Sequence, residues 1–203
     1  NDFAFSTCSS LESVTMGATG MQSIGKQAFS HCTKLTTITI PNSVATLGAE
    51  SFYNCTGLVS VSLSTSLSII PDRSFSYCLS LQTVTVPDQV TSIGSAAFYG
   101  CTQLTSITLP DSLLTIDPAA FAACESLTTV TLPNSVATLG YQAFYKCPSL
   151  VSVSLGTSLT LIDKHTFAFC RSLQSVIIPD SVQVINDFAF STCSSLESVT
   201  MGA

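Results

Sequence analysis

Cysteine is the chemically reactive residue with the most regular spacing in this sequence. From Cys32 to Cys193 the cysteines recur at one constant interval, and the interval from Cys8 to Cys32 is longer by a single position. If each interval is one coil of a parallel stack, equivalent α-carbons lie about 4.8 Å apart, which a disulfide accepts. Stacked side chains point the same way, however, and the cysteine count, 9, is odd. We therefore expect unpaired, buried thiols that pack as small apolar side chains. The ladder is Cys8, Cys32, Cys55, Cys78, Cys101, Cys124, Cys147, Cys170 and Cys193.

Other residues that could bind metal or catalyse a reaction are too scattered to form a site. There is no CxxC pair, and a row of cysteines does not cluster as zinc ligands must. His31 and His165 are six coils apart, about 29 Å at the parallel-strand spacing, so they cannot share one proton transfer. Asp88 and Asp111 occupy the same turn position in consecutive coils and could hold a weak cation, although Asx-turn hydrogen bonding explains both without metal. We expect no catalytic residue, no metal and no cofactor.

Composition narrows the classes of partner. The chain has 46% hydrophobic and 9% charged residues, and its net charge is −6. It has no cluster of lysine or arginine to bind phosphates, so we expect no nucleic-acid partner. No apolar run approaches the roughly 18 to 20 residues of a membrane helix, so we expect no membrane span in this segment. Any targeting segment would lie upstream of Asn1, which falls inside a motif.

The cysteine interval is the period of a structural repeat. In the unit Ile93–Thr115, the β-branched residues of the segment Leu104–Leu109 and its apolar alternation at Ile107 and Leu109 predict a short strand ending at Pro110. Asp117–Phe121 begins with a helix N-cap followed by proline, which predicts one turn of α or 3₁₀ helix. One unit is too small to fold alone, so stability comes from stacking. A phenylalanine in each unit predicts a second core ladder: Phe5, Phe29, Phe52, Phe75, Phe98, Phe121, Phe144, Phe167 and Phe190.

The pattern I-G-x-x-A-F-x-x-C-x-x-L-x-x-I-x-L-P-x-S-V-x-x resembles the BspA-like, or Treponema pallidum-type, leucine-rich repeats. The resemblance covers essentially the whole chain. It implies a leucine-rich-repeat solenoid of nine coils, each of about 23 residues, with a parallel β-sheet on one face and short helical or 3₁₀ turns opposite. It also implies extracellular or cell-surface exposure and a role in adhesion or surface architecture without enzymatic activity.

The outward face of the predicted sheet is a nearly uncharged surface of hydroxyl groups. It has no Trp, Tyr or Arg anchor of the kind that protein-binding faces concentrate. Small β-branched polar residues suit an exposed strand without any further role. Alternatively, the hydroxyls carry O-linked sugars or stack laterally against another solenoid, or their Thr-x-Thr rows bind ice. The positions are Ser13, Thr15, Thr37, Thr39, Ser60, Ser62, Thr83, Thr85, Ser106, Thr108, Thr129, Thr131, Ser152, Ser154, Ser175, Ser198 and Thr200, with Ile177 beside Ser175.

Two further features bear on function. Asn54 begins the sequon Asn54-Cys55-Thr56 and is a candidate N-glycosylation site, although its middle residue is a predicted core cysteine. Five tyrosines fall near the predicted helical turns, where they either pack over the phenylalanine ladder or bind a partner. They are Tyr53, Tyr77, Tyr99, Tyr141 and Tyr145.

The opening stretch of the chain, Asn1–Ala18, is identical to its final stretch, Asn186–Ala203. The identity extends to polar positions that packing does not dictate. We therefore interpret residues 1–203 as a single solenoid that is a segment of a longer tandem array. Exposed ends of such an array recruit further copies and generate a fibre.

The sequence predicts a non-enzymatic extracellular structural protein. It would form a stiff rod or filament at the cell surface, carry covalent glycans, and associate with itself end to end and laterally. Adhesion would be a companion role. The main alternative is a surface adhesin or receptor that binds a host protein or glycan, and the third is an ice-binding solenoid.

Overall fold

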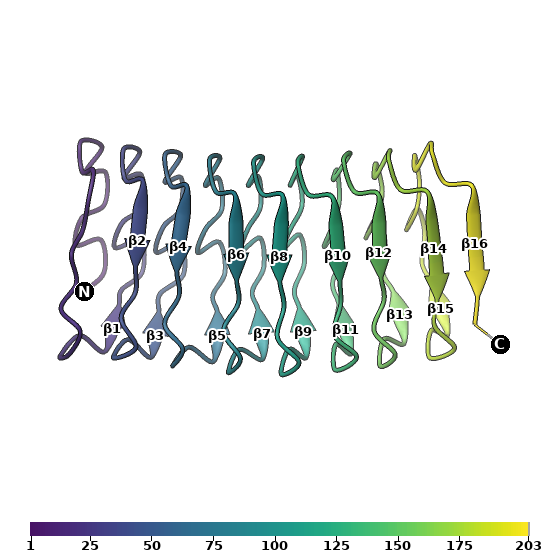
Figure 1. Cartoon of the computed structure of the whole chain (residues 1–203), viewed down its shortest axis with the longest axis horizontal. Helices are drawn as coiled ribbons and strands as arrows, with labels where there is room; N and C mark the ends of the chain where they lie inside the picture. Colours follow the sequence, from purple (N-terminus) through teal and green to yellow (C-terminus); the bar gives the residue numbers. More distant parts are fainter. Residues whose placement is uncertain (203) are drawn as a thin grey trace.

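The computed structural model describes residues 1–202 as a row of stacked coils, with the two termini at opposite ends of the long axis (Figure 1). Each coil after the first contributes one strand to a ribbon that runs along the molecule. The strands of this first ribbon are β2 (Thr37–Thr39), β4 (Ser60–Ser62), β6 (Thr83–Thr85), β8 (Ser106–Thr108), β10 (Thr129–Thr131), β12 (Ser152–Ser154), β14 (Ser175–Ile178) and β16 (Ser198–Met201).

The first ribbon is parallel and in register. It consists of two four-stranded sheets, in the orders β2-β4-β6-β8 and β10-β12-β14-β16. Partners are equivalent residues of adjacent coils, for example Thr83 with Ser106 and Val84 with Ile107. Between β8 and β10 the Thr128 amide still donates to the Thr105 carbonyl at 3.3 Å. The predicted parallel sheet is confirmed, and its residues alternate between the core and the surface as period-2 strands must.

A second ribbon of two-residue strands runs beside the first, and the sequence analysis did not anticipate it (Figure 1). It forms three parallel sheets, in the orders β1-β3, β11-β9-β7-β5 and β13-β15. In the interior of the molecule each strand points one apolar residue toward the core, as Ile93 does in β7. Its strands are β1 (Ser23–Ile24), β3 (Thr46–Leu47), β5 (Ile69–Ile70), β7 (Ser92–Ile93), β9 (Thr115–Ile116), β11 (Thr138–Leu139), β13 (Leu161–Ile162) and β15 (Val184–Ile185).

The predicted helical turn at Asp117–Phe121 is not confirmed: the segment forms consecutive turns, and residues 1–202 contain no α or 3₁₀ helix. The amides of Ala119, Phe121 and Ala123 donate to carbonyls of the next coil at 2.7–2.9 Å. Ala119 and Ala123 have φ of 57° and 58°, in the left-handed region. A helix would instead direct these amides back along its own backbone. Bonds between coils therefore alternate with bonds within the turns, where the amides of Ala120 and Ala122 donate to the carbonyls of Asp117 and Ala119 at 3.3 and 3.1 Å.

The core is built from ladders of equivalent residues, in which the phenylalanines and cysteines lie beside columns of buried leucine, isoleucine and valine. Adjacent phenylalanine rings from Phe5 to Phe190 stack with centroids 5.2–5.5 Å apart, and the six from Phe52 to Phe167 are fully buried. The predicted ladder is incomplete at its ends, where Phe5 is 48% exposed and Phe190 is half-buried. Each end residue has a neighbouring ring on one side only. Burial of aromatic rings on both faces stabilises the interior coils most.

Candidate functional site

All seventeen serines and threonines assigned to the hydroxyl face are exposed. Fifteen lie on the outward side of the first ribbon, and Ser13 and Thr15 lie in the first coil, which forms no strand there. Strand alternation explains this arrangement, because the residue between each pair, such as Val130 between Thr129 and Thr131, points into the core. Since the strands pair in register, equivalent hydroxyls form two parallel rows. The surface can therefore offer evenly spaced donors and acceptors to a long, regular partner.

Shallow hollows lie where the hydroxyl face meets the turns after the strands. One, of about 420 Å³, is lined by Ser62, Thr85 and Asp88 among others. A second, of about 310 Å³, is lined by Thr108, Thr131 and Asp111 among others. Asp88 and Asp111 are both exposed. Among residues 1–202, no three His, Cys, Asp or Glu side chains come together as a metal site.

Ile177 interrupts the hydroxyl rows near the C-terminal end of the ribbon. Its side chain is 68% exposed, and it pairs in register with Thr200 of β16. A hollow of about 550 Å³ beside it is lined by Ile177, Pro179 and Asp180 among others. This is the one position in the rows where a large apolar side chain stands in place of a hydroxyl.

The consecutive turns that precede each strand of the first ribbon form an edge of the molecule, which we call the turn edge. Four aromatic side chains on it form what we call the aromatic row: His31, Tyr53, Tyr77 and Tyr99. Their rings meet edge to face, with centroids 5.3–5.7 Å apart. A hollow of about 360 Å³ is lined by the three tyrosines and Arg73 among others. The tyrosines were predicted from the sequence as possible binding residues, whereas His31 was not grouped with them. The available signal was their spacing, which stays close to the cysteine interval.

A second aromatic cluster lies further along the same edge. Tyr145 and Phe169 meet edge to face at 5.5 Å, and the Lys146 ammonium lies 5.2 Å from the Tyr145 ring centroid. His165 stacks on Phe188 at 5.2 Å and meets Tyr141 edge to face at 5.9 Å. His31 and His165 are both half-buried and take part in aromatic contacts between coils.

Asn54, the candidate glycosylation site, lies in the turn edge in a left-handed conformation, with φ of 57°. Its side-chain amide is hydrogen-bonded to Nδ1 of His31 at 2.9 Å, and Asn54 is half-buried. Cys55, the middle residue of the sequon, is fully buried. A glycan at Asn54 would have to replace the bond to His31.

The nine cysteines are all unpaired, and seven of them are buried. Each thiol from Cys32 to Cys193 donates to the carbonyl of a phenylalanine in the preceding coil, as Cys124 does to Phe98 at 3.3 Å. Burial raises the pKa of Cys32 to about 11 and of Cys55 to about 12, and the neighbouring cysteine adds to both shifts. The thiols therefore stay protonated and act as donors that join one coil to the next.

The expected burial of Cys8 is wrong, since its side chain is exposed, and Cys193 is only half-buried. Both belong to the end coils, where packing covers one side. The hydrogen bond from each thiol to a phenylalanine carbonyl was not predicted from the sequence. The signal was the constant separation of the cysteine and phenylalanine ladders, which places the two side by side in every coil.

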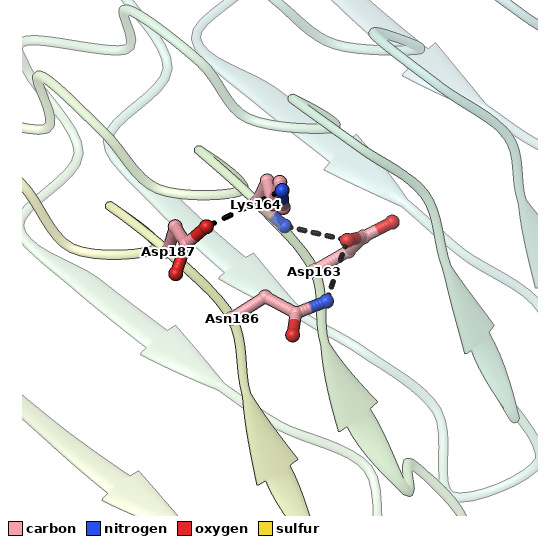
Figure 2. A network of polar contacts seen from close by, with 4 residues as sticks. All are labelled: Asp163, Lys164, Asn186 and Asp187. Carbon is pink, nitrogen blue, oxygen red and sulfur yellow. Dashed lines mark hydrogen bonds and ion pairs between the residues drawn. The ribbon is translucent and has the colours of Figure 1, made fainter.

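A polar network joins the last two coils on the outer surface (Figure 2). Asp163 Oδ1 accepts hydrogen bonds from the Asn186 side chain at 3.0 Å and the Lys164 amide at 2.7 Å. The Lys164 ammonium pairs with Asp187 at 3.3 Å. Asn186 and Asp187 begin the duplicated sequence, so the network is the point where the repeat restarts. Both side chains of the ion pair are exposed, so the pair itself contributes little stability.

No helix within residues 1–202 is long and apolar enough to cross a membrane. What the described chain offers is a set of extended, repetitive surfaces: the hydroxyl face, the aromatic row and the outer faces of the two end coils.

Comparison with known proteins supports the fold and assigns a family. The model of the BspA type leucine rich repeat region, which has six copies, matches residues 1–104 and 91–203. The leucine rich repeat protein of T. pallidum is 28% identical with a TM-score of 0.67, over 89% of this chain and 79% of that one. A leucine rich cell surface protein of Faecalibacterium prausnitzii is 26% identical with a TM-score of 0.58, over 100% of this chain and 69% of that one.

A leucine-rich repeat protein of Bacteroides ovatus has the same fold, with 24% identity and a TM-score of 0.59 over 100% of this chain and 71% of that one. No curated protein matches the chain. The family match is to a repeat, which agrees with the stacked coils, the in-register ribbon and the ladders of the structure. The chain belongs to the BspA-type leucine rich repeat family.

Proposed function

We propose that this chain is a non-enzymatic structural protein of the cell surface or extracellular space, a stiff segment of a rod or filament. The observation that carries the proposal is the unbroken register of its coils. Every interior coil repeats the same backbone bonds, ring stack and thiol bond as its neighbour. Such a stack is stabilised by each added coil, so its length can grow without a change of design.

The surface location is supported by family membership. One related structure is that of a leucine rich cell surface protein, and this chain is 26% identical to it. The exposed hydroxyl rows suit a protein that works in water outside the cell, because they are polar yet carry almost no charge. We extend this to covalent glycans on the hydroxyl face or lateral contact through it, with adhesion as a companion role.

Electron microscopy of native, unheated material tests the rod. We expect long uniform fibrils with an axial repeat of roughly 40 Å, which is eight coils at the parallel-strand spacing. Discrete particles of one array's length would contradict the filament. In the same material, mass spectrometry should find hexose on serine or threonine peptides of the hydroxyl face. Bare peptides throughout would remove the glycan part of the proposal.

The second candidate function is recognition of a glycan or host protein, and the aromatic row favours it. Aromatic rings that bear polar groups are the side chains that binding surfaces use as anchors. Tyr77, in the middle of the row, is exposed and lines the hollow with Arg73. If this surface binds, Tyr77→Ala should abolish retention on a glycan or host-protein array, while Thr85→Ala on the hydroxyl face should not. Equal retention of both variants would contradict the assignment.

A further inference from the structure

The last described coil lacks the backbone hydrogen-bond acceptors that the first coil, which has the same sequence, finds in its neighbour. In the first coil the amides of Phe3, Phe5 and Thr7 donate to carbonyls of the second coil at 2.7–2.8 Å. The equivalent amides of Phe188, Phe190 and Thr192 find no backbone acceptor within residues 1–202. Apolar side chains are open on the same coil, with Phe188 64% and Val199 50% exposed. Three donors and an apolar surface therefore face outward together.

The contacts of the first coil show what fits this surface. Asp2 Oδ1 accepts a hydrogen bond from the Lys26 amide at 2.8 Å, and the Phe5 ring stacks on Phe29 at 5.2 Å. The Cys32 thiol donates to the Phe5 carbonyl at 3.3 Å. Because residues 186–203 are identical in sequence to residues 1–18, they present the same groups to whatever follows. The coil that fits is the one that begins at Thr19.

The length of a coil determines the residue at which a following copy of the sequence can begin. Equivalent positions lie one cysteine interval apart, as Cys8, Cys32 and Cys55 do. The repeated segment, Asn186–Ala203, is shorter than one interval, so it needs the stretch from Thr19 onward to close its coil, including β1 (Ser23–Ile24). A copy that began at Asn1 would restart the pattern before the coil is complete and break both ladders.

Charge agrees with the same point of entry. Asp187 and the equivalent residues of the other coils lie in one column along the surface. In this column Lys164 pairs with Asp187, and in the first coils Asp2 is followed by Lys26. A following copy that begins at Thr19 places its Lys26 next to Asp187, so positive and negative side chains alternate from coil to coil along the column. Stacking the whole first coil on the last would place Asp2 next to Asp187, and like charges in contact repel.

We propose that a second copy of this sequence, beginning at its Thr19, packs on the outer face of residues 186–202. Asn186–Ala203 then takes the place of Asn1–Ala18 for the next unit, and the array has one joint that is used repeatedly. The inference rests on the proposed function in one respect, because it describes how units of the proposed rod are joined.

The test compares two longer chains with the 203-residue chain. In the first, Ala203 is followed directly by a second copy of residues 19–203. In the second, which is the control, it is followed by a second copy that starts at Asn1. Amide hydrogen exchange is read at Phe188, Phe190 and Thr192. We expect exchange about ten-fold slower or more in the first chain than in the original chain, and unchanged exchange in the control.

A pair of variants separates the joint from general stabilisation. Val199→Lys in the first copy of the Thr19-entry chain should remove the protection, because the charge lies inside the joint. Thr200→Lys, on the adjacent exposed hydroxyl face, should retain it. Rapid exchange of the three amides in the Thr19-entry chain, or equal protection in the control, overturns the proposal. Fibrils in native material bear on the rod alone, so the two proposals fail separately.

Discussion

At the residue scale, cysteine matters here as a hydrogen-bond donor within the core. Each phenylalanine carbonyl in the interior accepts both a backbone amide of its own coil and a thiol of the next, as Phe98 does from Cys101 and Cys124. Alanine is apolar enough for the site but cannot donate, and serine is more polar than the site. The cysteine ladder is thus part of the hydrogen bonding between coils.

Native-state alkylation checks the placement of the thiols. Without reductant or denaturant, iodoacetamide should label Cys8 rapidly, because it is exposed, and leave the seven buried cysteines unlabelled. All nine should react after denaturation, since none is in a disulfide. Peptide mass spectrometry gives the labelled positions. Rapid native labelling of Cys101 or Cys124 would contradict the packing of the ladder.

The raised thiol pKa values predict lower stability in base. The folded chain holds the protons of Cys32 and Cys55 up to about pH 11 and 12, whereas unfolded thiols lose theirs near 9.0. The stabilisation is therefore complete below pH 9.0 and is lost as the pH rises through the folded pKa values. The urea midpoint should fall between about pH 8 and about pH 11, and less steeply in Cys55→Ala. An identical slope in the variant would show that other groups cause the loss.

At the element scale, the sequence predicted one wall of the solenoid and not the other. The strand expected within Leu104–Leu109 is β8, because alternation of β-branched residues is a local signal. Asp117–Phe121 forms turns and not a helix, because alternate amides of the segment bond to residues one coil later. A two-residue strand such as β7 is too short to show a period of two. What depends on a neighbouring coil could not be read from one unit.

The site was predicted to a similar extent. The hydroxyl face follows from strand alternation, so every residue assigned to it is exposed. The aromatic row depends on how rings from different coils meet, which spacing alone does not define. Its function, like that of the hydroxyl face, stays a prediction.

Close approach of neighbouring coils predicts the effect of one methyl group. A Cβ added at Gly140 would lie 2.6 Å from the Pro118 nitrogen and 2.8 Å from the Asp117 carbonyl carbon, so backbone must shift. Gly140→Ala should lower the free energy of unfolding by about 1–3 kcal/mol. Gly17→Ala is the matched control, since its Cβ would have only the Thr19 carbonyl oxygen nearby, at 3.7 Å. Equal midpoints in urea for the two variants would contradict this account.

At the scale of the whole molecule, stability is a sum over similar coils and the contacts between neighbours. Fold integrity therefore depends on register more than on the number of coils. The ladders run through every coil, so removing a whole period realigns them, whereas removing part of one misplaces every residue beyond the cut.

Deletion of one coil tests this dependence on register. A chain that lacks Ile93–Thr115, one full unit, should fold with a modestly lower thermal midpoint, because Phe75 and Cys78 then stack on Phe121 and Cys124. A chain that lacks only Ile93–Leu104 should lose cooperative unfolding, since the remaining half-unit cannot join either ladder. Circular dichroism melts compare the two. Similar melts would show that register is not what holds the stack together.

The absence of helices within residues 1–202 bears on the shape of the solenoid. A solenoid bends when one wall takes more room per coil than the other, as it does when helices of about 10 Å diameter back strands about 4.8 Å apart. Here the rings behind the sheet are 5.2–5.5 Å apart, close to the strand spacing, and the coils follow one another in a nearly straight row (Figure 1). Curvature is small, so each added coil extends the molecule by the same increment. The length of such a solenoid is therefore proportional to the number of its coils.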